Sequence, residues 1–149
     1  MINIIITSYR EPKATLQAVK SFLNQDIREK LKEDFRIIVC DPFIEVKEFL
    51  KENIKNRRVG FFLDPGEGKS YALNLLLKKL QNKNNTEISD ESSGLETSNK
   101  EKKVSDNEKD IFIFTDGDVY VSNNSVKEIL KAFEDPKVGC VTGRPVPIN

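Results

Sequence analysis

Two acidic residues, Asp116 and Asp118, flank Gly117 directly after the apolar run 111–115. In an extended chain, side chains two residues apart project to the same side, so the two carboxylates are expected to lie side by side. Like charges at that separation repel unless solvent or a cation lies between them. Carboxylate oxygens are hard ligands that suit Mg²⁺ or Mn²⁺. We therefore expect a divalent-metal site with Asp118 and Asp116 as ligands, and the plain alternative is an acidic turn.

The segment 66–70, "GEGKS", follows an apolar run and precedes a predicted helix at 71–80. A glycine loop that ends in Gly-Lys-Ser between a strand and a helix is typical of P-loop NTPases. That pattern also requires a glycine five residues before Gly68, where this chain has Leu63. Pro65 removes one backbone N–H that would otherwise face a phosphate. An NTPase is therefore a minor alternative.

A phosphatase of the haloacid dehalogenase type is a second minor alternative, because such enzymes also carry an Asp-x-Asp motif after a strand. In this chain the motif comes late, and Val119 and Tyr120 follow it. The chain has no histidine, which excludes Ser-His-Asp triads and every zinc site that contains histidine. Any catalysis must use carboxylates, lysine or arginine, hydroxyls, backbone dipoles and hard metal ions.

The length and charge of the chain limit its class further. At 149 residues it is expected to form a single domain, 1–149. Its 24 basic side chains balance 24 acidic ones, so nucleic acid is not an expected partner. The N-terminus "MINIIITSYREP" lacks the features of a signal peptide and is expected to form the first strand. Cys40 and Cys140 are expected to be buried free thiols in a reducing compartment.

Apolar runs and helical periodicities alternate along the chain and predict an α/β fold. The run 111–115 is almost wholly apolar, so we expect it at the centre of a sheet covered on both faces. Ser125 to Glu128 has the form of a capping box at the start of a helix. Strands are predicted at 3–7, 36–40, 59–63, 111–115 and 138–142, with helices from Pro12, at 46–50, at 71–80 and from Ser125.

This order of elements predicts a doubly wound, mainly parallel sheet with helices on both faces. Ligands of such sheets bind beyond the carboxyl ends of the strands. Residues 81–110 contain only Ile88, Leu95 and Val104 as large apolar side chains. Such a segment cannot bury enough surface to offset its ordering entropy, so it is expected to be a flexible polar insertion loop.

Four segments in this order resemble the nucleotide-sugar-binding part of a family 2 glycosyltransferase, which has a GT-A fold. They are "INIIITSYREPKATLQAVKSFLNQ", "RIIVCDP", "GEGKSYALNLLLKKL" and "DIFIFTDGDVYVSNNSVKEILKAFEDPKVGCVTGRP". The resemblance covers nearly everything outside 81–110. The chain departs from the family pattern at Thr7, where proline is common, and at Arg10, where asparagine is usual. The run "PFIEV" after Asp41 also differs from the family.

The resemblance implies a role for each matching residue. Asp118 would ligate the metal that holds the diphosphate, and Asp116 would contact the ribose, the sugar or the metal. Asp41 would hydrogen-bond the nucleobase. The remaining roles are the nucleoside pocket for Ser8, Tyr9 and Glu11, the phosphates or the sugar for Lys69, and support of the loop for Asn74.

The function implied by the resemblance is transfer of a sugar from a UDP- or GDP-type donor with Mg²⁺ or Mn²⁺ as cofactor, with inversion. The general base of such enzymes comes from the acceptor-binding half, which is expected to lie beyond residue 149, so the chain is expected to be truncated. The catalytic base and the acceptor therefore have no assignment here. A nucleotide-binding or protein-interaction module without turnover is the alternative. The expected location is the cytoplasm, with membrane association only through other regions or partners.

Overall fold

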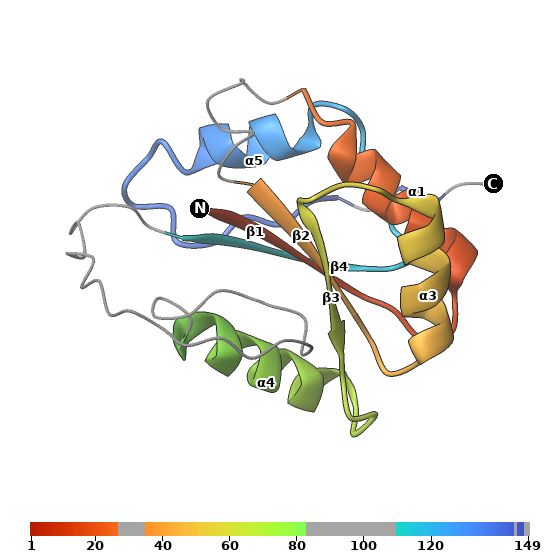
Figure 1. The fold of residues 1–149 in the computed structure, drawn as a ribbon. Helices are drawn as coiled ribbons and strands as arrows, with labels where there is room; N and C mark the ends of the chain where they lie inside the picture. Colours follow the sequence, from red (N-terminus) through yellow and green to blue (C-terminus); the bar gives the residue numbers. More distant parts are fainter. Residues whose placement is uncertain (27–34, 83–109, 145, 148–149) are drawn as a thin grey trace, which may run out of the picture.

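The computed structural model describes residues 1–26, 35–82, 110–144 and 146–147. In this part of the chain, four parallel strands form one sheet with helices on both of its faces (Figure 1). The elements are β1 (Ile2–Thr7), α1 (Pro12–Leu23), β2 (Phe35–Asp41), α3 (Ile44–Asn53), β3 (Val59–Leu63), α4 (Lys69–Asn82), β4 (Ile111–Asp116) and α5 (Ser125–Ala132). The predicted α/β class with a parallel sheet is confirmed.

The strand order β3-β2-β1-β4 places β1 between two partners. Its last residue, Thr7, lies opposite Cys40 of β2 and opposite Asp116 of β4. On the far side of β2, Asp41 lies opposite Leu63, the last residue of β3. Because all four strands are parallel, their carboxyl ends meet along one edge of the sheet, where a ligand site is expected.

Each face of the sheet has its own apolar core, because side chains alternate between the faces along each strand. On one face Ile4, Ile6 and Ile37 pack with buried residues of α1, α3 and α5. On the other face Ile5 and Ile38 pack with residues of α4. Figure 1 shows α4 alone on one side of the sheet, with α1, α3 and α5 on the other. The two layers hold the strand ends in fixed positions relative to α4.

Local sequence explains where α1 and α4 begin at the carboxyl edge of the sheet. Pro12 opens α1, since its fixed φ suits the first helical position and its missing N–H would have no intrahelical acceptor there. Before α4, Gly66 and Gly68 adopt φ values of 78° and 102°, which disfavour any side chain with a Cβ. The first bond of α4 runs from Ala72 N–H to the carbonyl oxygen of Gly68.

Two expectations about the sheet are wrong. β4 is not central: it forms the edge of the described sheet, and Phe114 is 51% exposed. An apolar run indicates burial but does not specify which strands lie beside it. Residues 138–142 form no strand, and Val138 N–H instead closes a turn onto the carbonyl of Asp135. Gly139 in this stretch is exposed, and no described strand pairs with it to form a ladder.

Three local expectations also need correction. The N-cap of α5 is Asn124 rather than Ser125, and no side-chain capping bond forms, so the capping box is absent. Cys40 is buried as expected, but Cys140 is exposed because the segment around it does not enter the sheet. Helix α4 extends to Asn82, so residues 81 and 82 are helical. Most of the predicted polar insertion, residues 83–109, lies outside the described residues.

A search of the described helices for a membrane span is negative: each is too short or too polar to cross a bilayer.

Candidate functional site

A cavity of about 430 Å³ opens at the carboxyl edge of the sheet, between the ends of β1, β2 and β4 and the start of α4. Residues from the strand ends, from the loop before α4 and from the turn after β4 line it. They are Thr7, Ser8, Tyr9, Glu11, Cys40, Pro42, Asp64, Gly66, Gly68, Lys69, Ala72, Asp116, Gly117 and Asp118. All four sequence segments that carry the candidate residues thus contribute to the cavity wall, and the second of them does so through Cys40 and Pro42.

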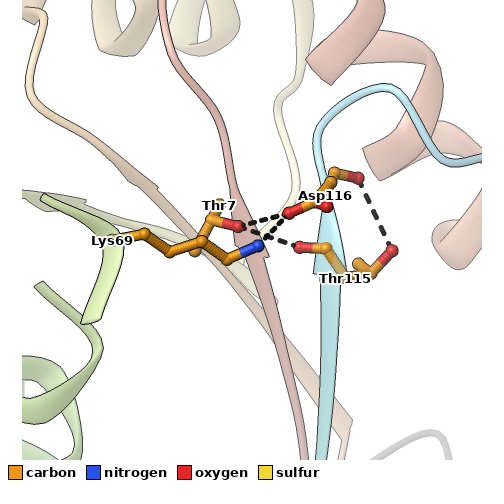
Figure 2. A network of polar contacts seen from close by, with 4 residues as sticks. All are labelled: Thr7, Lys69, Thr115 and Asp116. Carbon is orange, nitrogen blue, oxygen red and sulfur yellow. Dashed lines mark hydrogen bonds and ion pairs between the residues drawn. The ribbon is translucent and has the colours of Figure 1, made fainter.

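Asp116 is the centre of a polar network in this cavity (Figure 2). Its Oδ1 atom accepts a hydrogen bond from Lys69 Nζ and another from the hydroxyl of Thr7, the latter at 2.9 Å. The hydrogen bond from Lys69 holds the pKa of the Asp116 carboxyl below its usual value, with a smaller contribution from Thr7. The carboxylate is therefore ionised and paired at neutral pH.

The segment from Asp116 to Asp118 forms a turn rather than the extended chain expected from its spacing. Val119 N–H donates to the carbonyl oxygen of Asp116 at 3.2 Å, which closes the turn. Gly117 N–H donates to the carbonyl of Thr7 at 2.8 Å. A Cβ on Gly117 would lie 2.7 Å from the Cβ of Ser8, so only glycine fits at this position. A turn packed against Ser8 and Thr15 replaces the expected extended geometry, yet both carboxylates still line the cavity.

The donor set suits a hard divalent cation only in part. Asp116 and Asp118 supply carboxylate oxygens from one turn, and Asp118 is exposed. Lys69 already occupies Oδ1 of Asp116. Among the described residues, no cluster of three or more acidic or cysteine side chains could hold a metal ion. These residues therefore fit a cation that takes its remaining ligands from water or from a bound phosphate.

The glycine loop before α4 presents Lys69 to the cavity. Asp64 begins the loop, and its Oδ1 atom accepts a hydrogen bond from Gly66 N–H at 2.7 Å. Lys69 is the first residue of α4, so its side chain lies beside the N-terminal end of a helix. The partial positive charge of that end and the ammonium group both favour an anion.

Tyr9 and Glu11 lie on the segment that leaves β1, and both are exposed at the cavity. The Tyr9 ring is 68% exposed and stands edge-on to Phe43, with 5.0 Å between ring centroids. The Arg10 guanidinium lies 4.1 Å from the centroid of the same Phe43 ring. Arg10 has φ of 58°, an uncommon value for a residue with a side chain. Tyr9 lines the cavity, while the Arg10 guanidinium lies over the Phe43 ring.

Two of the predicted site residues do not line the cavity. Asp41 is 4% exposed, and its two oxygens accept hydrogen bonds from Ser8 Oγ at 2.6 Å and from Phe43 N–H at 2.8 Å. It therefore lies behind Ser8 and supports it. Asn74 is exposed one turn into α4. The roles of these two residues, and those of Ser8, Tyr9, Glu11, Lys69, Asp116 and Asp118, stay predictions.

Three cavity residues with hydrogen-bonding side chains were not assigned a role from the sequence: Thr7, Cys40 and Asp64. The Asp-Pro-Gly sequence that begins at Asp64 is a recognisable turn signal, since aspartate accepts backbone N–H groups two residues further on. Thr7 is the last residue of β1, and Cys40 is the last but one of β2. The apolar runs of the sequence could have indicated that both lie at the carboxyl edge of the sheet. Their contacts with Asp116 and Asp64 depend on strand order and could not be read from the sequence.

Comparison with known proteins identifies a shared fold. No protein-family model matches the chain, and no curated protein matches it either. Crystal structures of S. aureus TarS do match. Residues 1–349 of TarS align over 99% of this chain and 38% of that one, with 20% identity and a TM-score of 0.51. The complex of the same TarS fragment with UDP-GlcNAc aligns over 99% and 37%, with 19% identity and a TM-score of 0.53.

The fold is GT-A-like. This confirms the fold class expected from the sequence, while membership of family 2 stays a prediction. The chain spans less than two fifths of the length of the TarS structures that it matches. At this level of identity the likeness concerns the fold alone.

Proposed function

We propose that this chain binds a nucleotide-diphosphate sugar and forms the donor-binding part of a metal-dependent glycosyltransferase. The observation that carries the proposal is the charge of the cavity: four carboxylates and one lysine line it at the carboxyl edge of a GT-A-like sheet. TarS is a glycosyltransferase, and the TarS fragment with the same fold was crystallised with UDP-GlcNAc. This supports a nucleotide-sugar ligand for the cavity.

The balance of charges supports the metal as well. A diphosphate would be repelled by Glu11, Asp64, Asp116 and Asp118 unless a cation entered with it. Asp118 is the ligand that we assign to that cation, because it is exposed in the cavity and Asp116 is paired with Lys69. When bound, Mg²⁺ or Mn²⁺ would neutralise part of the charge on the diphosphate.

The chain's own residues would act on the donor in defined ways. Breaking the bond between sugar and diphosphate accumulates negative charge on the leaving group, and a positioned ammonium group stabilises that charge. We assign this role to Lys69, which lines the cavity at the start of α4. Tyr9 offers an exposed aromatic ring for the nucleoside, and Ser8 offers a hydroxyl held in place by Asp41.

The finer assignments are proposals of the same kind. We assign the chain to family 2 with an inverting mechanism, a UDP- or GDP-type donor and an acceptor-binding half outside these residues. That half would supply the general base. We place the activity in the cytoplasm, which suits two cysteines that are both free thiols.

Binding without turnover is a second candidate, because none of the described cavity residues is assigned the role of general base. Incubation with UDP-GlcNAc and Mn²⁺ distinguishes the two. Release of UDP supports catalysis, whereas binding without release of UDP supports a donor-binding module.

A ligand screen tests the proposed donor class. Thermal shifts would be recorded with UDP, GDP, their sugars and ATP, each with and without Mn²⁺. We expect a UDP- or GDP-type ligand to raise the melting temperature, and only with the divalent ion. Tight ATP binding that is lost in Lys69→Ala would overturn the proposal in favour of an NTPase.

A further inference from the structure

Among the four acidic residues that line the cavity, Asp64 is the one whose two carboxylate oxygens each accept a hydrogen bond from a described residue. Oδ1 accepts from Gly66 N–H at 2.7 Å, and Oδ2 accepts from the thiol of Cys40 at 3.6 Å. Its backbone N–H extends the sheet by donating to the carbonyl of Asp41 at 3.3 Å. Through these bonds one half-buried residue joins β2, the end of β3 and the loop that leads to α4.

Cys40 acts as a donor in this arrangement. Its side chain is 1% exposed. Burial, with a further contribution from the charge of Asp64, raises the pKa of the thiol to about 12. The thiol thus keeps its proton at neutral pH and can donate a hydrogen bond to the carboxylate. Cys40 also lies opposite Thr7 in the sheet, and Thr7 lies opposite Asp116. The bond from Cys40 therefore ties Asp64 to the strands β1 and β4, which hold Asp116 in place.

The loop needs such an anchor. Gly66 and Gly68 both have positive φ, and glycine loses more conformational freedom on folding than any other residue. Packing around the two glycines is sparse: a Cβ on Gly68 would meet nothing within 4 Å, and one on Gly66 would meet only Pro42, at 3.7 Å. Leu76 and Leu80 hold α4 against the sheet, and the bonds made by the loop backbone add a constraint at its first turn, where Lys69 lies.

We propose that Asp64 is a positioning residue, which holds the 64–68 loop against β2 and thereby sets where the ammonium group of Lys69 meets a bound diphosphate. This inference rests on the proposed donor-binding function. Asp64 acts through Lys69, and its carboxylate bonds to the protein rather than to the donor.

Two substitutions separate positioning from direct binding. Asp64→Asn keeps a side-chain oxygen that can accept Gly66 N–H, and its amide nitrogen can donate to the Cys40 sulfur in place of the present bond from the thiol. Only the charge is lost, so we expect UDP-GlcNAc affinity close to native. Asp64→Glu keeps a carboxylate in the cavity but is one methylene too long for the bond to Gly66, and we expect affinity to fall about five- to tenfold. The opposite order, with Asn weak and Glu near native, would overturn the proposal in favour of direct contact with the ligand or its metal.

A double-mutant cycle supplies the second readout. Isothermal titration with UDP-GlcNAc and Mn²⁺ would compare Asp64→Glu, Lys69→Met and the double variant. Since Asp64 acts through Lys69, the double variant should bind no more weakly than Lys69→Met alone. Fully additive losses would contradict the proposal. Glu67→Gln, an exposed carboxylate of the same loop, is the matched control and should bind like the native chain.

A measurement without ligand keeps the inference separate from the proposed function. Hydrogen exchange of the Gly66 amide, followed by NMR, should be slow in the native chain and in Asp64→Asn, and at least tenfold faster in Asp64→Glu. Slow exchange in Asp64→Glu would overturn the anchoring role. If neither the native chain nor any variant binds UDP-GlcNAc, the proposed donor site is wrong, whatever the exchange rates of the Gly66 amide show.

Discussion

Lys69, the first residue of α4, places its ammonium group on Oδ1 of Asp116, the last residue of β4. The two residues belong to different motifs of the sequence, and the fold brings their side chains into contact (Figure 2) in the wall of one cavity. In the ligand-free chain each neutralises the other. A diphosphate that attracts Lys69 would free one oxygen of Asp116 for a sugar, a ribose or a metal ion.

The first prediction concerns Lys69. Replacing it in Lys69→Met removes a charged hydrogen-bond donor, so UDP-GlcNAc affinity should fall roughly ten- to a hundredfold. Isothermal titration in the presence of Mn²⁺ measures the change. Lys78→Met, an exposed lysine of the same helix outside the cavity, is the control and should bind as the native chain does. Equal losses in both variants would mean that only the general charge of α4 matters.

Gly117 should be intolerant of any side chain. In Gly117→Ala the new Cβ would lie 2.7 Å from Ser8 Cβ and 2.9 Å from Thr15 Oγ1. Overpacking of this kind costs about 1–3 kcal/mol of the free energy of unfolding. Urea unfolding checks this, with Gly139→Ala as control because nothing lies within 4 Å of a Cβ there. A stable Gly117→Ala would show that the turn after β4 is not packed on β1.

The two cysteines should differ in reactivity. Cys140 is exposed, whereas Cys40 is buried with its pKa raised to about 12. At pH 8 we expect a thiol-specific chromogenic reagent to modify one thiol quickly and the second only after unfolding in guanidinium. Cys140→Ser should remove the fast phase and leave the slow one. A fast phase that survives in Cys140→Ser would contradict the burial of Cys40 and its bond to Asp64.

The ionisation of Asp116 offers a test by pH. Its carboxyl pKa is lowered, chiefly by the hydrogen bond from Lys69. Because the Asp116 pKa is lower in the folded chain than in the unfolded chain, the ionised carboxylate stabilises the fold at every pH above the unfolded-state pKa of about 3.9. This stabilisation is lost as the pH falls through the folded-state pKa. The pair is exposed, so the contribution should be about 0.2–1 kcal/mol. NMR titration of the Asp116 carboxyl should show its pKa rising in Lys69→Met, and an unchanged pKa there would rule out the pair in solution.

Much of this fold follows from the sequence, because each of the four strands is a short apolar run and α1 buries residues at helical spacing from Thr15 to Phe22. The order of the strands does not follow, since the apolar character of 111–115 indicates burial without naming its neighbours. That is why β4 was expected at the centre and lies at the edge. The run 138–142 has strand-like composition too, but no described strand pairs with it.

The sequence likewise predicted some residues of the candidate site but not the contacts between them. Residue types at the strand ends identified Asp116, Asp118 and Lys69, because ligands of parallel sheets bind at that edge. The pairing of Lys69 with Asp116 and the anchoring of Asp64 by Cys40 depend on tertiary contacts. Asp41 has the expected position in the sequence, yet its oxygens are directed to Ser8 and to the backbone of Phe43.

The central claim is that Asp118 holds a divalent cation that brings a nucleotide-diphosphate sugar into the cavity. Isothermal titration of UDP-GlcNAc, with and without Mn²⁺, tests it most directly in the native chain, in Asp118→Asn and in Glu134→Gln. Glu134 is an exposed acidic residue that does not line the cavity. We predict binding that requires Mn²⁺ in the native chain and in Glu134→Gln, and none in Asp118→Asn. Equal binding without metal, or undiminished binding in Asp118→Asn, would contradict the claim.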